Sequence, residues 1–413
     1  MCGILGFISR NKFKDKFNLV RGNMSLKYLD RRGPDNMNSF FMETERYNLF
    51  LGHTRLAIQD LSQDYNQPYT EKINNNRLVY NGEIYNYNNF EKYKEFSSDT
   101  KALYKLLSNH RENLSMFDGI FSFGFWNQEE GILYLGRDRF GVKPLFLYIL
   151  DDFIAFSSSI RALEKLCEGN FVLNFDFAKE SLNLGYVHNC STIYQGINKL
   201  SQNTLLSFNP ENWKLSKSKI YKNKINDEVA KEKINLSKLK KNLVNVLKSQ
   251  VSLSDRGCGF FLSGGTDSSL IVSEVNKLNL KSKINTYSLI LPGSRNDESR
   301  NIDLFRKLVL KKSKIEYKVT LFDEKEIEKA LNLYPNLDYP VLDLSIIPTI
   351  SLCKSVDKEI RVILSGDGAD ELFYGYPRIY QTFWRFSIIY FISKFLKNFI
   401  LYLFPNRNRL KKY

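Results

Sequence analysis

Apolar residues over the first 200 positions fall in short runs, and turn-forming residues such as Gly, Asn and Asp separate these runs. Each run is rich in Phe, Tyr, Ile or Leu, a pattern typical of β-strands joined by turns. The predicted strands cover residues 3–9, 78–80, 120–126, 132–135, 145–150 and 153–156. Helical spacing of Leu103, Leu106 and Leu107 predicts a helix at 100–109, which Ser98 or Asp99 can cap. Strands with a few helices between them predict an α+β layered domain over residues 1–208.

The pattern changes after a polar stretch, rich in Lys and Asn, at residues 209–233, which we expect to be a linker. Beyond it, apolar strand-like runs alternate with helix-like segments. We predict helices at 236–251, from 268 and at 299–310, strands at 259–262, 284–291, 315–320 and 362–364, and two further helices before the last strand. Alternation of this kind predicts a parallel sheet covered on both faces, within a second domain over residues 234–413.

Composition is consistent with two globular domains, because 413 residues with 43% hydrophobic content can bury a sizeable core. The chain has 60 Lys and Arg against 45 Asp and Glu, a net charge of +15. Lys, Asn and Ile are enriched together along the whole chain, and no compact basic and aromatic module stands out. We therefore predict no nucleic-acid partner.

Cysteine and histidine are too few and too scattered to suggest a disulfide framework or a Cys/His metal site. The first residues carry no basic segment before a long apolar stretch, so we expect no secretory signal and a cytoplasmic location. Residues 383–404 are strongly apolar but contain charged side chains, and their uninterrupted runs fall short of the roughly 20 residues that span a bilayer. We expect an amphipathic helix packed on the fold, with weak membrane-surface contact as the alternative.

Cys2 is the first candidate for chemistry. Removal of Met1 would leave a thiol and a free α-amine on one residue, and an amine with a pKa near 7.7–8.0 can act as the base for the thiol. Four motifs follow in order: RRGPD at 31–35, GHTRLAI at 52–58, NGEIYN at 81–86 and SD at 98–99. With these residues the sequence resembles the glutamine amidotransferases of the N-terminal-nucleophile type, and most closely the glutamine-hydrolysing asparagine synthetases of class B.

The resemblance implies roles for individual residues. Cys2 would attack the side-chain amide of glutamine, and the Asn81 side chain with the Gly82 N–H would stabilise the oxyanion, each such donor contributing roughly 3–4 kcal/mol. Arg55 would pair with the α-carboxylate, and Asp99 with Glu83 would hold the α-ammonium. The implied backbone lining of the same pocket is Leu56, Ala57, Ile58 and Gln59. The motif GRDRFGVKPL at 136–145 is interpreted as scaffold.

The second constellation is FFLSGGTDSS at 260–269, an apolar strand followed by a Gly turn and the start of a helix. Backbone N–H groups and hydroxyls converge at such a helix N-terminus, where an anion binds well. The segment lacks the Gly-Lys-Ser/Thr ending of a Walker A loop. It resembles instead the pyrophosphate-binding loop of ATP pyrophosphatases.

A second Gly-rich turn, in VILSGDGADELF at 362–373, brings several carboxylates to the end of another predicted strand. By resemblance, Asp267 and Asp370 would bind Mg²⁺ beside the triphosphate, and Asp367 would act catalytically near an acyl-adenylate. The ATP-binding residues implied are Leu262, Ser263, Gly264, Gly265, Asp267, Ser268, Ser269, Leu289, Ser365 and Gly366. Residues 343–348 resemble the family's segment on the side of the acceptor substrate.

The resemblance implies an N-terminal αββα amidotransferase domain, a C-terminal ATP-pyrophosphatase domain of the adenine nucleotide α-hydrolase type, and ATP and Mg²⁺ as cofactors. Three residues differ from the family's usual choice: Arg31 for His, Thr266 for Leu and Ser158 for Glu. A Pro-Gly pair usual near 202–203 is absent. Members of the family normally continue into a further helical region after the second Gly-rich turn, whereas here an aromatic-rich segment follows from 383 to Tyr413. We therefore expect a synthetase domain incomplete at its C-terminus, and a short C-terminus that limits the synthetase reaction more than the glutaminase reaction.

The activity expected from these motifs is ATP-dependent synthesis of asparagine from aspartate and glutamine. One alternative is amidation of another carboxylate, such as a uronic acid of a surface polysaccharide, because pocket shape rather than motif selects the acceptor. Another is a glutaminase or glutamine-binding module with an inactive synthetase half. The expected partners are small-molecule substrates, and a homodimer is left open.

Overall fold

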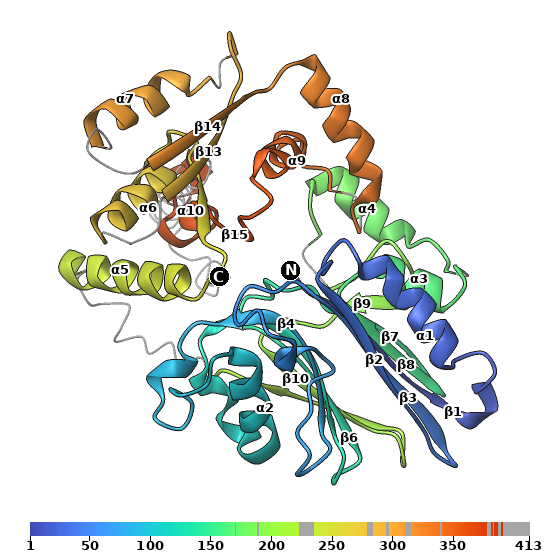
Figure 1. The fold of residues 1–413 in the computed structure, drawn as a ribbon. Helices are drawn as coiled ribbons and strands as arrows, with labels where there is room; N and C mark the ends of the chain where they lie inside the picture. Colours follow the sequence, from blue (N-terminus) through green and yellow to red (C-terminus); the bar gives the residue numbers. More distant parts are fainter. Residues whose placement is uncertain are drawn as a thin grey trace, which may run out of the picture.

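The computed structural model describes residues 1–169, 171–187, 190–222, 235–278, 284–294, 297–309, 315–338, 341–377, 381–382, 384–386 and 390. Two antiparallel sheets form in the first half of the chain and one parallel sheet in the second half. Figure 1 shows the first half, coloured blue to green, and the second half, yellow to red, as separate bodies in contact.

The first antiparallel sheet has the order β2-β3-β1-β8-β7-β9, which places the N-terminal strand in its middle. Its strands are β1 Gly3–Arg10, β2 Asn36–Glu43, β3 Tyr47–Arg55, β7 Phe146–Leu150, β8 Phe153–Ser157 and β9 Ile197–Lys199. The second has the order β11-β10-β6-β5-β4. Its strands are β4 Arg77–Ile84, β5 Gly119–Asn127, β6 Ile132–Arg137, β10 Thr204–Asn209 and β11 Lys214–Lys219.

The two sheets face each other, and helices cover their outer faces. Ile4 and Ile8 of β1 pack with residues of the second sheet, whereas Leu5 and Phe7 pack on the opposite side with helix residues. This alternation follows from the two-residue period of a strand. The covering helices are α1 Leu19–Leu26 and α3 Ile160–Leu166 on the first sheet and α2 Asp99–Asn109 on the second, and α4 Phe175–Leu184 follows α3. The predicted αββα arrangement is confirmed.

The parallel sheet of the second half has the order β14-β13-β12-β15. Its strands are β12 Cys258–Phe261, β13 Ile284–Ile290, β14 Ile315–Leu321 and β15 Val362–Leu364. The helices are α5 Leu236–Ser252, α6 Thr266–Lys277, α7 Ser299–Val309, α8 Glu324–Leu333, α9 Ile346–Ser355 and α10 Ala369–Phe373. The predicted alternation of strands and helices is therefore found, and the Gly-rich turns follow the carboxyl ends of β12 and β15.

The segment expected to be a linker, 209–233, begins inside the first domain. Strand β11 pairs with β10, and Tyr221 is buried and donates from its hydroxyl to the Phe117 carbonyl at 2.7 Å. Alternating Lys and Ser on an exposed edge strand concealed this element in the sequence. The first domain thus reaches Tyr221, and residues 223–234 lie outside the described part.

The apolar segment 383–404 also lies outside the described residues, apart from 384–386 and 390. Its predicted helix, its packing and its contact with a membrane surface all stay predictions. Among the described residues, none of the helices combines the length and the apolarity that crossing a membrane requires.

Close packing around β1 predicts the effect of Gly6→Ala. A Cβ at Gly6 would lie 2.4 Å from the Phe156 ring and 3.0 Å from Leu51. We expect the free energy of unfolding, measured by urea denaturation, to fall by about 1–3 kcal/mol, the usual cost of overpacking a core.

The control is Gly131→Asn, because Gly131 has φ +62°, nothing lies within 4 Å of its Cβ position, and Asn tolerates left-handed backbone. Its unfolding free energy should change by less than about 0.5 kcal/mol. Equal stability of Gly6→Ala and the wild-type chain would contradict the close approach.

Candidate active sites

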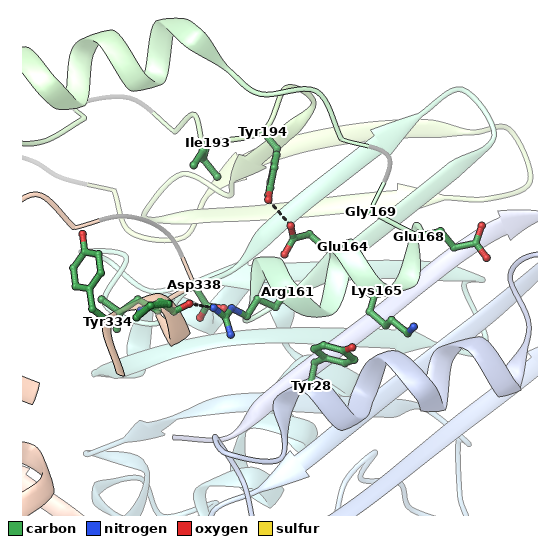
Figure 2. Close-up of a pocket in the computed structure, with 12 residues that line it drawn as sticks. Tyr28, Arg161, Glu164, Lys165, Glu168, Gly169, Ile193, Tyr194, Tyr334 and Asp338 are labelled. Atoms are coloured by element: carbon green, nitrogen blue, oxygen red, sulfur yellow. Dashed lines mark hydrogen bonds between the residues drawn. The ribbon is translucent and has the colours of Figure 1, made fainter. Parts of the chain in front are cut away.

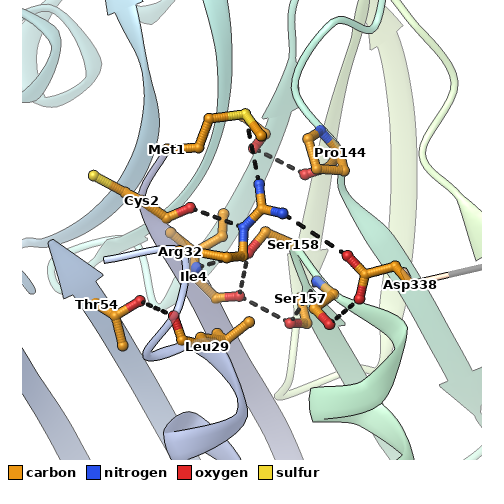
Figure 3. A network of polar contacts seen from close by, with 12 residues as sticks. Met1, Cys2, Ile4, Leu29, Arg32, Thr54, Pro144, Ser157, Ser158 and Asp338 are labelled. Carbon is orange, nitrogen blue, oxygen red and sulfur yellow. Dashed lines mark hydrogen bonds and ion pairs between the residues drawn. The ribbon is translucent and has the colours of Figure 1, made fainter. Parts of the chain in front are cut away.

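Cys2 lies directly before β1, where strand pairing fixes the backbone. The Leu56 N–H donates to Cys2 Sγ at 3.4 Å, and Sγ lies 3.8 Å from the Leu56 carbonyl. The Arg32 Nε donates to the Cys2 carbonyl at 3.2 Å (Figure 3). Burial raises the pKa of the Cys2 thiol, and the nearby N-terminal amine opposes this rise. The thiol is thus positioned but needs a base. The amine beside it in this structure is that of Met1, and burial lowers the pKa of the Met1 amine to about 6.

A cavity of about 510 Å³ opens beside Cys2 and brings predicted site residues together. Four other residues predicted for glutamine hydrolysis line it with Cys2: Ile58, Asn81, Gly82 and Glu83. Arg55, Leu56, Ala57, Gln59 and Asp99 do not line it. The opposite wall comes from the second domain and includes Arg361, Ser365 and Asp367.

The Asn81 side chain is fully buried, and neither its oxygen nor its nitrogen has a hydrogen-bond partner. A buried unpaired amide is costly, so this group is suited to a ligand that completes its hydrogen bonding. The adjacent Gly82 has no room for a side chain, because a Cβ there would lie 2.4 Å from the Ile120 carbonyl oxygen. Both features fit the oxyanion role that the sequence predicts.

Two carboxylates belong to this region: Asp99 is buried, and Glu83, which lines the cavity with Asn81, is partly buried. Asp99 Oδ2 accepts from the Tyr80 hydroxyl at 2.8 Å and from the Ile84 N–H at 3.0 Å. Glu83 Oε2 accepts from Gln59 Nε2 at 2.5 Å. Burial raises the pKa of both carboxyls, and the charge of Asp99 raises that of Glu83 further. A bound α-ammonium would supply the positive charge that these carboxylates lack.

Arg55 is buried, and the structure shows it binding its own loop. The guanidinium donates to the carbonyls of Asp60 at 2.5 Å and Ser62 at 2.6 Å, and to Asn66 Oδ1 at 3.0 Å. These contacts close the 59–66 loop beside the glutamine cavity. Binding of an α-carboxylate by Arg55 therefore stays a prediction. It would require the guanidinium to give up one of these hydrogen bonds or to share a donor between its present acceptor and the carboxylate.

Lys143 is a cavity residue that the sequence analysis assigned to scaffold. It is buried, it lines the cavity with Cys2 and Glu83, and burial lowers the pKa of its ammonium. The motif alone did not predict that Lys143 lines the cavity, because its location depends on the conformation of the turn at 138–143. Three backbone N–H groups of that turn donate to Asp138, including the Lys143 N–H at 3.0 Å.

The second predicted site forms a cavity of about 420 Å³ at the carboxyl ends of β12 and β15. Most residues predicted to bind ATP line it: Leu262, Ser263, Gly265, Asp267, Ser268, Leu289, Ser365 and Gly366. Gly264 and Ser269 do not. The cavity also contains Glu371, a further carboxylate of the second Gly-rich motif, and Thr349, Leu352 and Tyr376, which no motif indicated.

Hydroxyl groups hold the first Gly-rich turn in shape. The Ser263 and Ser268 hydroxyls lie 3.0 Å apart, and Ser263 Oγ accepts from the Gly265 N–H at 3.2 Å. A Cβ on Gly366 would lie 3.0 Å from the Ser268 nitrogen and from Asp267 Cβ, so the two Gly-rich turns touch at the N-terminus of α6. This contact requires glycine at 366.

Four carboxylates line the same cavity: Asp267, Asp367, Asp370 and Glu371. Within the described residues, no group of three or more His, Cys, Asp or Glu is arranged to hold a metal alone. Mg²⁺ normally takes one or two carboxylates and completes its shell with phosphate oxygens and water. The donor set therefore fits Mg²⁺ bound together with a nucleotide, and Asp267 and Asp370 as its ligands stay a prediction.

The two cavities share a wall. Ser365 and Asp367 line both of them, and the Ser365 hydroxyl donates to Asp367 Oδ2 at 2.8 Å. Cys2 lies at one side of this wall and the Gly-rich turn that follows β12 at the other. The geometry is that of an enzyme that joins a thiol-dependent amidotransferase to a nucleotide-dependent ligase.

Comparison with known proteins identifies the family. A glutamine amidotransferase domain model matches residues 1–221, and an asparagine synthase model matches residues 238–404. A Methanocaldococcus jannaschii protein named as a glutamine-hydrolysing asparagine synthetase is 30% identical over 96% of this chain and 79% of its own length. The Bacillus subtilis glutamine-hydrolysing asparagine synthetase 1 is 26% identical over 91% of this chain, which spans 59% of that protein. The chain belongs to the family of glutamine-hydrolysing asparagine synthetases.

A solved structure also aligns with the chain. The glutamine phosphoribosylpyrophosphate amidotransferase of B. subtilis has a TM-score of 0.39 and 13% identity, over 78% of this chain and 81% of that one.

The buried carboxyls predict a pH effect on stability. The pKa of Glu83 is raised from 4.5 to about 8, so its stabilising contribution is complete below pH 4.5 and is lost as pH rises through 8. Glu83→Gln carries no such proton. Between pH 5 and pH 8 the unfolding free energy of the wild-type chain should therefore fall, relative to Glu83→Gln, by at least about 1 kcal/mol.

Urea denaturation at several pH values measures this difference. Glu91→Gln is the control for the loss of a carboxyl group, since the Glu91 side chain is 85% exposed. Parallel stability curves for Glu83→Gln and the wild-type chain would contradict the raised pKa.

Proposed function

We propose that this chain synthesises asparagine from aspartate, with glutamine as nitrogen donor and cleavage of ATP to AMP and pyrophosphate. The observation that carries the proposal is the wall shared by the two cavities, with Cys2 on one side and the anion-binding turn of β12 and α6 on the other. Family membership gives the reaction type, and the geometry supports transfer of nitrogen between these sites.

Glutamine hydrolysis begins at Cys2 in this proposal. After removal of Met1, the α-amine of Cys2 takes the thiol proton, and the thiolate attacks the side-chain amide. The unpaired Asn81 amide and the Gly82 N–H stabilise the oxyanion, which is the role that best accounts for a buried amide without a partner. Glu83 and Asp99 bind the α-ammonium of glutamine.

The carboxyl ends of β12 and β15 carry out the ATP-dependent step. The backbone N–H groups at the start of α6 and the Ser263 and Ser268 hydroxyls bind the phosphates. Mg²⁺, held by Asp267 and Asp370, would neutralise phosphate charge. Attack by the acceptor carboxylate on the α-phosphorus then forms an acyl-adenylate and releases pyrophosphate.

Ammonia must reach this adenylate without taking up a proton, because ammonium is not a nucleophile. The cavity from Cys2 to Asp367 is lined by the buried ammonium of Lys143 and by Arg361, which pairs with Asp35 at 3.6 Å. The carboxylates of Glu83 and Asp367 line the same cavity, so its fixed charges are mixed in sign. In this proposal ammonia stays neutral because removal from water disfavours the charged form.

The acceptor is the least determined substrate. Aspartate is proposed from family membership, while amidation of another carboxylate, such as a polysaccharide uronic acid, uses the same two cavities and the same steps. The discriminating experiment follows pyrophosphate release from ATP with aspartate and with uronic acids as competing acceptors. Pyrophosphate release with uronic acids alone would replace asparagine synthesis by this alternative.

Cys2→Ala should abolish glutamine-dependent product formation and leave ammonia-dependent formation intact, because only the glutaminase step uses the thiol. Glutamate release and pyrophosphate release, measured in parallel, test this expectation. The matched control is Cys190→Ala, a partly exposed thiol that lines neither cavity. Normal glutamate release by Cys2→Ala would refute the role of the thiol.

Asp267→Asn and Asp370→Asn should lower pyrophosphate release by at least about 100-fold, because each removes a charge beside the triphosphate while preserving shape. Glutamate release should remain, since neither residue lines the Cys2 cavity. Asp303→Asn, on an exposed position of α7, is the control. Retained pyrophosphate release in both site variants would show that these carboxylates do not hold the metal. A wild-type chain that releases glutamate but releases no pyrophosphate with any carboxylate would favour a glutaminase with an inactive synthetase half.

A further inference from the structure

A carboxylate of the second domain contacts the residues that hold Cys2 in place. Asp338 lies just after the short turn η7, Tyr334–Asn336, and its Oδ2 is 3.8 Å from the Arg32 guanidinium. Arg32 also donates from Nε to the Cys2 carbonyl at 3.2 Å. Figure 3 shows Arg32 between the Cys2 carbonyl and the Asp338 carboxylate. One guanidinium thus joins the nucleophilic residue to the synthetase half.

A second set of contacts leads from Asp338 to β1. The Ser159 hydroxyl donates to Asp338 Oδ1. Ser159 follows two serines that bind Ile4: the Ser157 hydroxyl donates to the Ile4 carbonyl at 3.0 Å, and the Ile4 N–H donates to Ser158 Oγ at 3.0 Å. The Ser159 N–H donates to Ser157 Oγ at 3.1 Å, so Asp338 reaches the Ile4 backbone indirectly, by way of Ser159 and Ser157.

We propose that Asp338 is a positioning residue for glutamine hydrolysis: through Arg32 and Ser159 it holds the Cys2 backbone at the angle that directs Sγ toward the substrate amide. This inference rests on the proposed glutaminase activity of Cys2. It assigns a glutaminase role to a residue outside the domain that contains the thiol. The half of the chain that activates the acceptor thereby completes the half that releases ammonia.

Charge and burial support this role. The side chains of Arg32 and Asp338 are only 16% and 25% exposed, so their attraction is less screened than that of a surface pair. The other side-chain contact of Arg32 is Met1 Sδ at 3.8 Å, which is lost when Met1 is removed. Among the described residues, Asp338 is then the side chain that orients the far end of the guanidinium.

The position of Asp338 in the chain connects it to the acceptor side of the synthetase site. Residues 343–348, which resemble the acceptor segment, follow within ten positions and lead into α9. Thr349 and Leu352 of α9 line the nucleotide cavity.

The test uses the full chain with Asp338→Asn, Arg32→Gln and the double variant. We expect Asp338→Asn to lower kcat for glutamine hydrolysis about three- to thirtyfold, with KM changed less than about twofold, because misdirection of a nucleophile slows the chemical step more than binding. The double variant should be slower than Arg32→Gln alone by less than the full effect of Asp338→Asn, since Arg32 carries part of the action of Asp338 and Ser159 the rest. The alkylation rate of Cys2 by iodoacetamide should change in the same order.

The control is Arg161→Gln. Arg161 donates to the Pro335 carbonyl across the same domain boundary, in a cavity of about 780 Å³ that also contains Asp338 (Figure 2). Among the described residues it has no hydrogen bond to Cys2 or Arg32. If Asp338→Asn unfolds, Ser159→Ala carries the same test with a smaller expected loss.

Unchanged kcat and alkylation in Asp338→Asn, additive losses with Arg32→Gln, or an equal loss in Arg161→Gln would each overturn the proposal. Alkylation needs no glutamine, so it tests Asp338 independently of turnover. A wild-type chain that hydrolyses no glutamine would contradict the proposed function, whereas the alkylation rates would still decide the role of Asp338.

Discussion

Removal of water from the ionisable groups around Cys2 is the constraint on which the first site depends. The thiol, Glu83, Asp99 and Lys143 all lie at or beside one cavity. Burial raises the pKa of the thiol and of the two carboxyls and lowers that of the Lys143 ammonium, and each shift favours the neutral form of the group. The fold sustains this cost because two sheets and their helices surround the site with apolar side chains. A zwitterionic substrate would bring an α-ammonium next to carboxylates that have no positive partner in the protein.

The two domains depend on each other at this boundary. The Cys2 cavity is closed on one side by β15 and α5 residues, so a glutaminase domain alone would leave it open to water. Backbone contacts reinforce the closure: the Asp60 N–H donates to Asp255 Oδ2 at 2.8 Å, and the Asp255 N–H donates to the Ile58 carbonyl at 3.1 Å. These bonds connect the loop bound by Arg55 to the second domain. Shape at the glutamine site is therefore a property of both halves.

Much of this arrangement could be predicted from the sequence, because the strands with strong apolar runs and the Gly-rich turns carry local signals. Ser98 caps α2 as expected, and β12 leads into α6 where the turn residues indicated. Strands β2 and β3 were missed: β2 is half polar, and the second half of β3 carries the motif GHTRLAI, which was interpreted for its chemistry alone. A strand buried on both faces shows no alternation that would reveal it.

The site residues divide in the same way. Asn81, Gly82 and the turn around Ser263 could be found because their motifs are contiguous. Lys143 and Asp338 could not be found in this way, because their roles depend on contacts with residues more than 100 positions away in the chain. Sequence spacing carries no information on such contacts when a single sequence is considered. Only the folded chain shows that Arg32 and Ser159 meet the same carboxylate.

Because β1 lies in the middle of its sheet, its amino end is enclosed late during translation of the chain. Its two neighbours are β3, which ends at Arg55, and β8, which ends at Ser157. The amino end of the chain leaves the ribosome first, yet it cannot be enclosed until about 100 further residues have followed β3. At about 5–20 residues per second, translation leaves the terminus accessible for several seconds. An aminopeptidase can remove Met1 in that interval, before strand pairing closes over the nucleophile.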